Sequence, residues 1–162
     1  MTMVSYLKGD ATNPTGDGRK MIVHICNDIG GWGAGFVLAV SAKWKEPESA
    51  YRKWFRDSPR DMPPFSLGEV LFVDVSPDLC VANLIGQRGI RGGRSTPPIR
   101  YDAVRKGLQT IADEAIRRRT SVHMPRIGCG LAGGKWEEIL KIINETLIPA
   151  GIDVTIYDFA QS

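Results

Sequence analysis

The sequence predicts an α/β fold: a three-layer α/β/α sandwich around a mixed, mostly parallel central sheet. Short β-branched apolar runs alternate along the chain with longer segments whose apolar residues recur at helical spacing. Glycine-rich turns follow two of the apolar runs and precede helical segments, as in parallel sheets. The 162 residues contain no repeat or linker, so residues 1–162 are expected to form one domain.

The first half of the chain opens with a short apolar run at 3–7, interpreted as a strand, and a loop rich in glycine. Residues 21–26 (MIVHIC) are β-branched and apolar, which predicts a buried strand. Apolar residues at helical spacing predict a helix at 36–44. A second short helix is expected at 48–55, because Pro47 ends the first helix and suits the first turn of the next.

The second half opens with two strands, 68–75 and 79–85, whose short connection predicts a hairpin. The rest alternates amphipathic helices with apolar strands. We expect helices at 101–119 and 135–147, and strands at 122–127 and 152–158.

Composition narrows the class of protein. Hydrophobic residues make up 43% and charged residues 24%, as in ordinary globular domains, and no apolar run approaches a membrane span. Without a signal-peptide pattern we expect a cytoplasmic protein. We also expect it to be a monomer. Three scattered cysteines (Cys26, Cys80 and Cys129) and two histidines argue against a disulfide framework or a zinc site. We expect no metal and no cofactor. The net charge of +3 suits an anionic ligand and is too small to indicate binding to nucleic acid.

A glycine-rich turn at residues 128–133 matches G-x-G-x-x-G between a predicted strand and helix. Such turns let a phosphate approach the backbone amides, although a tight turn that binds nothing has the same pattern. A dinucleotide fold is excluded because only one helix and one strand follow. A nucleoside triphosphatase loop is excluded because Cys129 and Trp136 stand where glycine and Ser or Thr are required.

A second glycine-rich turn, at residues 30–35, follows the predicted strand at 21–26. Both turns are expected at the carboxyl edge of the sheet, where they could hold the two ends of a diphosphate. Asn27 could bind a sugar hydroxyl or a water, and Asp28 could be a base or a turn cap. Trp32 could cover a sugar or pack as a hydrophobe.

The chain resembles the macrodomain family over its whole length. The resemblance rests on residues 9–11 (GDA), 24–27 (HICN) running into GWGAGF at 31–36, 125–131 (PRIGCGL) and 156–159 (IYDF). The stretch at 124–131 is similar to the terminal ADP-ribose protein glycohydrolases, and 24–54 to the yeast ADP-ribose-1''-phosphate phosphatase type.

The resemblance implies that ADP-ribose binds across the strand ends. Asp10 would accept from the adenine amino group with support from Ala11, Phe159 would pack on adenine, and Asn27 would hold the distal ribose. Loop capping by Asp10 and a core position for Phe159 are the alternatives. The remaining implied ligand contacts come from the two glycine turns: Trp32, Gly33, Ala34, Gly35 and Phe36, and Gly128, Cys129, Gly130, Leu131, Ala132 and Gly133.

Two departures bear on mechanism. Relatives in the glycohydrolase branch use a lysine and an aspartate where this chain has Gln87 and Ala132, so a covalent lysine route is closed. We expect a water-based route in which Asn27 orients the water, Gln87 donates to the developing oxyanion and Asp28 is a spare base. His24 lies within an apolar run and is interpreted as a core histidine.

The expected function is removal of mono-ADP-ribose from Asp or Glu side chains of modified proteins. An ADP-ribose-1''-phosphate phosphatase and a non-catalytic ADP-ribose reader are the alternatives. A remoter one is binding of RNA or poly(ADP-ribose) through the arginines of residues 86–100, which predicts steep salt dependence.

Overall fold

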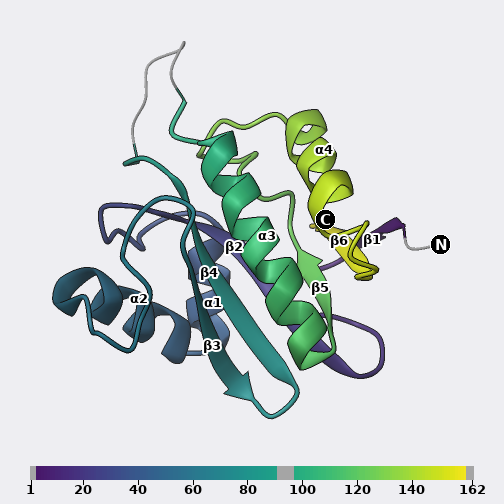
Figure 1. Ribbon diagram of the computed structural model, residues 1–162, viewed down its shortest axis with the longest axis horizontal. Helices are drawn as coiled ribbons and strands as arrows, with labels where there is room; N and C mark the ends of the chain where they lie inside the picture. The colour runs from purple at the N-terminus through teal and green to yellow at the C-terminus, as the bar shows by residue number, and fades with distance from the viewer. Residues whose placement is uncertain (1–2, 91–96, 160–162) are drawn as a thin grey trace.

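Six strands form one sheet in the order β1-β6-β5-β2-β4-β3, in a computed structural model that describes residues 3–90 and 97–159 (Figure 1). The strands are β1 (Val4–Lys8), β2 (Arg19–Asn27), β3 (Val70–Ser76), β4 (Leu79–Gln87), β5 (Thr120–Met124) and β6 (Val154–Asp158). The helices are α1 (Phe36–Lys43), α2 (Glu46–Asp57), α3 (Tyr101–Arg118) and α4 (Trp136–Thr146). The ten predicted elements are all present, in the predicted order.

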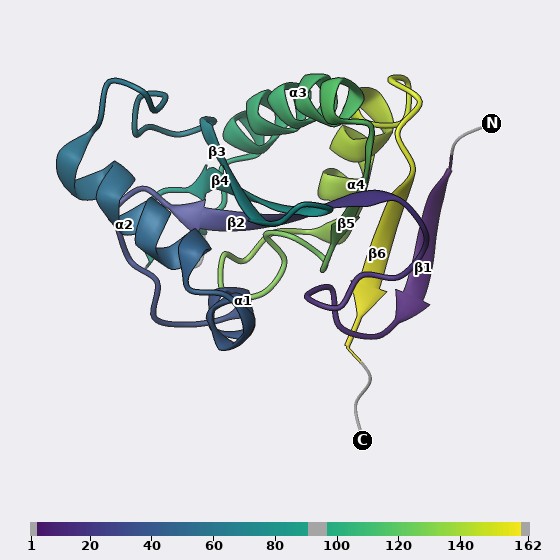
Figure 2. The same ribbon diagram turned by 90° about the horizontal axis from the view of Figure 1, so that it is seen from below.

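Helices cover both faces of the sheet, which confirms the predicted three layers. Figure 2 shows α3 and α4 on one side of the sheet and α1 on the other, with α2 beside α1 near β3. The alternation of side chains along β2 separates two cores. Met21 and Val23 belong to the core beneath α3 and α4, whereas Ile22 belongs to the core that includes Tyr51 and Trp54 of α2.

Every neighbouring pair of strands is parallel except β3 and β4, which form the predicted antiparallel hairpin. The parallel strands therefore end at one common edge, where the chain passes into the two glycine-rich turns. The prediction that a strand extends to residue 127 is wrong, because β5 ends at Met124. Pro125 follows and has no amide hydrogen with which to continue the ladder.

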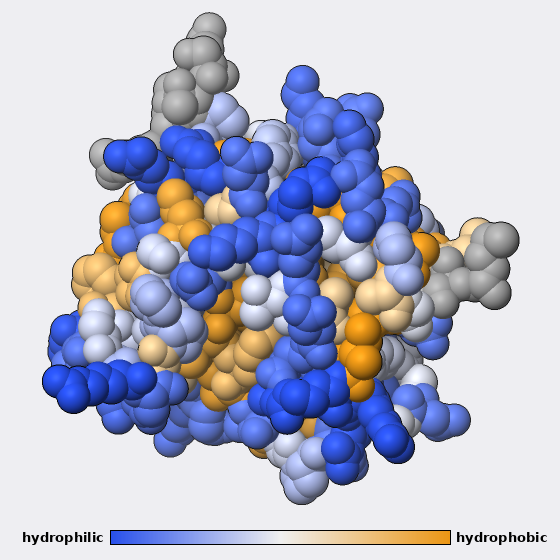
Figure 3. Space-filling view, in the orientation of Figure 1, coloured by the Kyte–Doolittle hydropathy of each residue, from blue (hydrophilic) through white to orange (hydrophobic). Residues whose placement is uncertain are grey.

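The exposed surface is mostly polar on the side of α3. Hydrophilic side chains follow this helix across the face shown in Figure 3. Within residues 3–90 and 97–159, the helices are all too short or too polar to cross a membrane.

Candidate functional site

The carboxyl edge of the sheet carries a cleft between the two glycine-rich turns. It consists of two adjoining cavities of about 420 Å³ and 440 Å³. Both cavities are lined by Ile25, Ala34, Val37, Gln87 and Leu131, so they form one continuous groove. The first cavity extends toward β5 and the second toward the turn after β2.

Asn27 organises the turn that follows β2. Its Oδ1 accepts hydrogen bonds from the amides of Ile29 (3.1 Å) and Gly31 (2.9 Å), and its Nδ2 donates to the Gly31 carbonyl at 2.9 Å. Tyr51 of α2 adds a donor, with its hydroxyl 2.8 Å from Oδ1 and 2.6 Å from the Asn27 carbonyl. The side chain lines the second cavity, so the structure brings Asn27 to the cleft as predicted.

Trp32 is a packed wall of the cleft, and its contact with a sugar stays a prediction. It is 4% exposed and belongs to the core beneath α1 and α2, yet it also lines the second cavity. Its Nε1 donates to Ser41 Oγ at 2.6 Å, and that hydroxyl donates to Glu48. The hydrogen bonds from the indole to Ser41 of α1 and from Ser41 to Glu48 of α2 therefore fix the orientation of the ring.

The turn at residues 128–133 combines packing with an open centre. A Cβ atom at Gly128 or Gly133 would collide with Ile99 or Pro97, and both glycines have a positive φ. A Cβ at Gly130 would meet no heavy atom within 4 Å, and Gly130 lines the first cavity. The ends of this turn therefore pack tightly and its middle opens into the cleft, and phosphate binding by the turn stays a prediction.

Both turns that line the cleft contain backbone amides without a hydrogen-bond acceptor among the described residues. Within the described residues, three consecutive amides on each side have no hydrogen-bond acceptor: those of Gly33, Ala34 and Gly35, and those of Gly130, Leu131 and Ala132. The residues carrying them line the groove. Leu131 is 71% exposed and its Cδ1 lies 3.5 Å from where a Gly35 Cβ would be, so it reaches across between the turns. Such unpaired amides are suited to an anion.

Gln87 lies at the centre of the groove and lines both cavities. Its Nε2 donates to the Gly89 carbonyl at 2.9 Å, which leaves a second hydrogen on the same nitrogen. Asp28 is placed differently from its predicted role as a spare base. Its carboxylate accepts the Gly89 amide at 2.7 Å, and it lines neither cavity. Asp28 thus ties the turn after β2 to the turn after β4.

His24 is a core histidine, as the sequence indicated. Burial lowers its pKa to about 4, so the ring is neutral at pH 7. Asn83 Nδ2 donates to the Pro47 carbonyl, which directs its Oδ1 to His24 Nε2 at 2.5 Å. Nε2 therefore carries the proton, and Nδ1 is a buried acceptor with no partner among the described residues.

Cys129 is not activated. Burial raises the pKa of its thiol, and Sγ lies 3.4 Å from the Ile127 carbonyl. The following helix begins at Trp136, too far along the chain for its N-terminal amides to favour a thiolate. We therefore interpret Cys129 as a small residue that packs in the turn.

Five of the predicted ligand residues do not line the cleft: Asp10, Ala11, Cys129, Gly133 and Phe159. Asp10 Oδ1 accepts both the amide and the hydroxyl of Thr12, which is the loop-capping arrangement that was the alternative. Phe159 is 74% exposed and is not a core residue. Their contacts with adenine remain predictions.

Arg126 lines the first cavity and was given no role from the sequence. Its guanidinium forms a paired contact with Asp158 at 2.6 Å and 3.0 Å, which holds the pKa of that carboxyl below its usual range. The same group lies over the rings of Tyr6 and Trp136, 5.3 Å and 5.1 Å from their centres. The sequence feature that could have identified Arg126 was its position just before the glycine-rich turn at residues 128–133.

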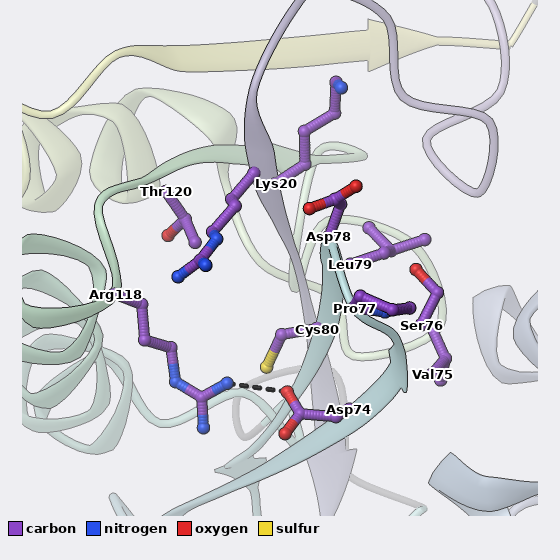
Figure 4. Close-up of a pocket in the computed structure, with 11 residues that line it drawn as sticks. Lys20, Asp74, Val75, Ser76, Pro77, Asp78, Leu79, Cys80, Arg118 and Thr120 are labelled. Carbon is purple, nitrogen blue, oxygen red and sulfur yellow. Dashed lines mark hydrogen bonds and ion pairs between the residues drawn. The ribbon is translucent and has the colours of Figure 1, made fainter.

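A separate cavity of about 500 Å³ lies at the opposite, amino edge of the sheet. Figure 4 shows Arg118 and Asp74 paired within it, and none of the predicted site residues line it. No cluster of three potential metal ligands occurs in the parts of the chain that the structure describes. Of the predicted arginine loop, Arg91 and Arg94 lie outside those parts.

Curated relatives match all or part of the chain. The chromodomain-helicase-DNA-binding protein 1-like of Danio rerio is 32% identical over 169 residues, covering 99% of this chain and 16% of that protein. The chain thus spans about a sixth of that relative's length. The ADP-ribose 1''-phosphate phosphatase of Candida albicans is 25% identical over 88% of this chain and 93% of its own length. The ADP-ribose glycohydrolase OARD1 of Bos taurus is 36% identical over 58 residues, which are 35% of this chain and 38% of that protein.

Solved structures match over the full length, whereas no protein-family model matches. A protein of unknown function from Bacteroides thetaiotaomicron is 57% identical with a TM-score of 0.92, over 98% of this chain and 99% of that one. A macrodomain protein from Streptomyces coelicolor is 50% identical with a TM-score of 0.85, over 98% of this chain and 100% of that one. This full-length identity, together with the fold and the glycine-lined cleft, shows that the chain belongs to the macrodomain family.

Proposed function

We propose that this protein binds ADP-ribose in the cleft and hydrolyses the ester that joins ADP-ribose to Asp or Glu side chains of modified proteins. One observation carries the proposal: two sets of unpaired backbone amides flank a groove with Gln87 at its centre. A diphosphate supplies acceptors for both sets, and a nucleoside on one side and a ribose on the other would occupy the two cavities. The names of the glycohydrolase and phosphatase relatives support the same ligand class.

The lining of the groove favours an ester over bonds that need strong acid–base catalysis. Within the described ranges no Asp, Glu or Lys lines it, and His24, which lines the first cavity, is only 1% exposed and is neutral because burial lowers its pKa. An acyl ester already has a good leaving group, so it needs a positioned water and stabilisation of the oxyanion. The free Nε2 hydrogen of Gln87 is a donor for that oxyanion.

The reaction would proceed by attack of water on the ester carbonyl carbon. A diphosphate oxygen of the ligand takes the proton from the water, the bond between carbonyl carbon and ribose oxygen breaks, and that proton passes to the ribose oxygen. The products are a free carboxyl on the modified protein and ADP-ribose. In this scheme Asn27 holds the water or a distal hydroxyl through Nδ2.

A non-catalytic reader of ADP-ribose is the second candidate, favoured by the same shortage of acid and base groups. The experiment measures release of free ADP-ribose from a Glu-linked mono-ADP-ribosylated protein, alongside calorimetric binding of ADP-ribose. Release with binding supports the hydrolase, and binding without release supports the reader. ADP-ribose-1''-phosphate as a parallel substrate tests the phosphatase alternative. Absence of binding would refute the proposal.

A further inference from the structure

A buried tyrosine lies directly beneath the proposed reaction centre. Tyr51 projects from α2 and is 0% exposed, and it lines neither cavity of the cleft. Its hydroxyl lies 2.6 Å from the Asn27 carbonyl oxygen and 2.8 Å from Asn27 Oδ1. Burial raises the pKa of Tyr51, so the hydroxyl keeps its proton and acts as a donor. The single hydroxyl hydrogen of Tyr51 is thus shared between the main-chain oxygen of Asn27, the nearer acceptor, and its side-chain oxygen.

The contacts of Asn27 fix which end of its amide serves the cleft. The amides of Ile29 and Gly31 fill the two lone pairs of Oδ1, and the Tyr51 hydroxyl lies 2.8 Å from the same oxygen while its single hydrogen is shared with the Asn27 carbonyl. Nδ2 donates one hydrogen to the Gly31 carbonyl, and its second hydrogen has no acceptor among the described residues. Asn27 can therefore offer a ligand one donor and no acceptor.

We infer that Tyr51 is the positioning residue that makes Asn27 a fixed hydrogen-bond donor at the distal end of the cleft. This inference rests on the proposed function of the same site. Asn27 then contacts an oxygen lone pair, either of a distal hydroxyl or of the attacking water, and does not accept a proton from either. Because Tyr51 touches no ligand, its whole effect on the reaction passes through Asn27 and its turn.

A double-mutant cycle separates this role from a general contribution to stability. Tyr51→Phe removes only the hydroxyl, and Asn27→Ala removes the group that it positions. We expect Tyr51→Phe to lower kcat by about fivefold to tenfold with KM changed less than about twofold, and to have no further effect in the Asn27→Ala background. Thr146→Val is the matched control, because it deletes a buried hydroxyl bonded to Ile142 O on α4.

The outcomes are distinguishable. If Tyr51→Phe slows the Asn27→Ala protein as much as the wild type, or leaves the wild-type rate unchanged, the inference is wrong. If the wild type shows no turnover, the hydrolase proposal fails, and the positioning of Asn27 by Tyr51 is then tested by the resonance of the Asn27 side chain alone. The side-chain ¹⁵N resonance of Asn27 gives a reading independent of activity: we expect it to shift or broaden in Tyr51→Phe and to remain in place in Thr146→Val. An unchanged resonance overturns the inference.

Discussion

Asn27 and Gln87 are paired backbone positions at the carboxyl ends of β2 and β4. Cys26 pairs with Ile85 and Asn27 pairs with Gln87, so the register shifts by one residue and Gly86 is left without a partner on β2. Without this irregularity Gln87 would not lie beside Asn27 at the strand ends, because one residue of slip moves a strand side chain to the other face of the sheet. The two amides that the proposed mechanism uses are thus set opposite one another by a bulge.

Replacing Gln87 tests its proposed role as the oxyanion donor. Gln87→Ala should lower ester hydrolysis by about 100-fold, the usual effect of removing one such donor, while ADP-ribose affinity changes less than about threefold. Steady-state hydrolysis and calorimetry on the same sample measure both quantities. Equal losses in rate and affinity would instead place Gln87 in ground-state binding.

Filling the open centre of the glycine turn should block the ligand without unfolding the protein. A Cβ at Gly130 meets nothing within 4 Å and the residue has no positive φ, so the unliganded fold accommodates a Cβ there and Gly130→Val adds two methyl groups to that open space. We expect a melting temperature within about 2 °C of wild type and at least a tenfold loss of ADP-ribose affinity. Gly33→Val, equally open on the facing turn, is the companion variant. Normal affinity in both would show that the diphosphate does not lie between the turns.

The two histidines should make stability fall in mild acid. Burial lowers the pKa of His24 and His123 to about 4, from 6.5 for an exposed side chain. Between these values the unfolded chain is protonated and the native ring is not, so unfolding takes up protons and stability falls as pH drops from about 6.5 to about 4. Each shift corresponds to up to roughly 3 kcal/mol.

Urea titrations between pH 7.5 and 4.5 measure this dependence. The slope of the unfolding free energy should correspond to nearly two protons around pH 5. The conservative variant His123→Gln should reduce the slope to about one proton. A flat profile from pH 6.5 to 5 would contradict the assignment of both rings as neutral.

The contact between α3 and β4 should not tolerate an added methyl group. A Cβ at Gly107 would lie 2.6 Å from Leu84 Cδ1 and 2.7 Å from Cδ2. Helix propensity favours Gly107→Ala by about 1 kcal/mol, and overpacking of a filled core costs about 1–3 kcal/mol, so we expect net destabilisation of about 1 kcal/mol. Denaturant unfolding measures it, with Thr110→Ala on the exposed face of α3 as the control. A more stable Gly107→Ala protein would show that the helix can shift away from Leu84.

Local patterns predicted most of the architecture. The apolar run at β2, the helical spacing in α3 and the glycine turn at 128–133 are properties of adjacent residues, and each produced the expected element. Pro47 likewise lies in the first turn of α2, although that helix begins at Glu46, before the predicted residue 48. The core position of His24 also followed from its apolar neighbours.

The roles of individual side chains depended on contacts between distant segments. The sequence left Asp28 open as a base or a turn cap, and only the fold shows that Oδ1 of its carboxylate accepts the amide of Gly89 from the turn after β4. Arg126 reaches the cleft because Asp158 and two aromatic rings hold it there. Nothing near Tyr51 in the sequence points to Asn27, because α2 and β2 meet only in the folded core.

The sequence by itself therefore determined the alternation of strands and helices, the family resemblance and the two glycine turns, because periodicity and glycine act over a few residues. The tertiary structure alone decided which polar groups remain unpaired and face the cleft. A hydrogen-bonding group is available to a ligand only if no other part of the chain satisfies it, and packing brings together those competing partners.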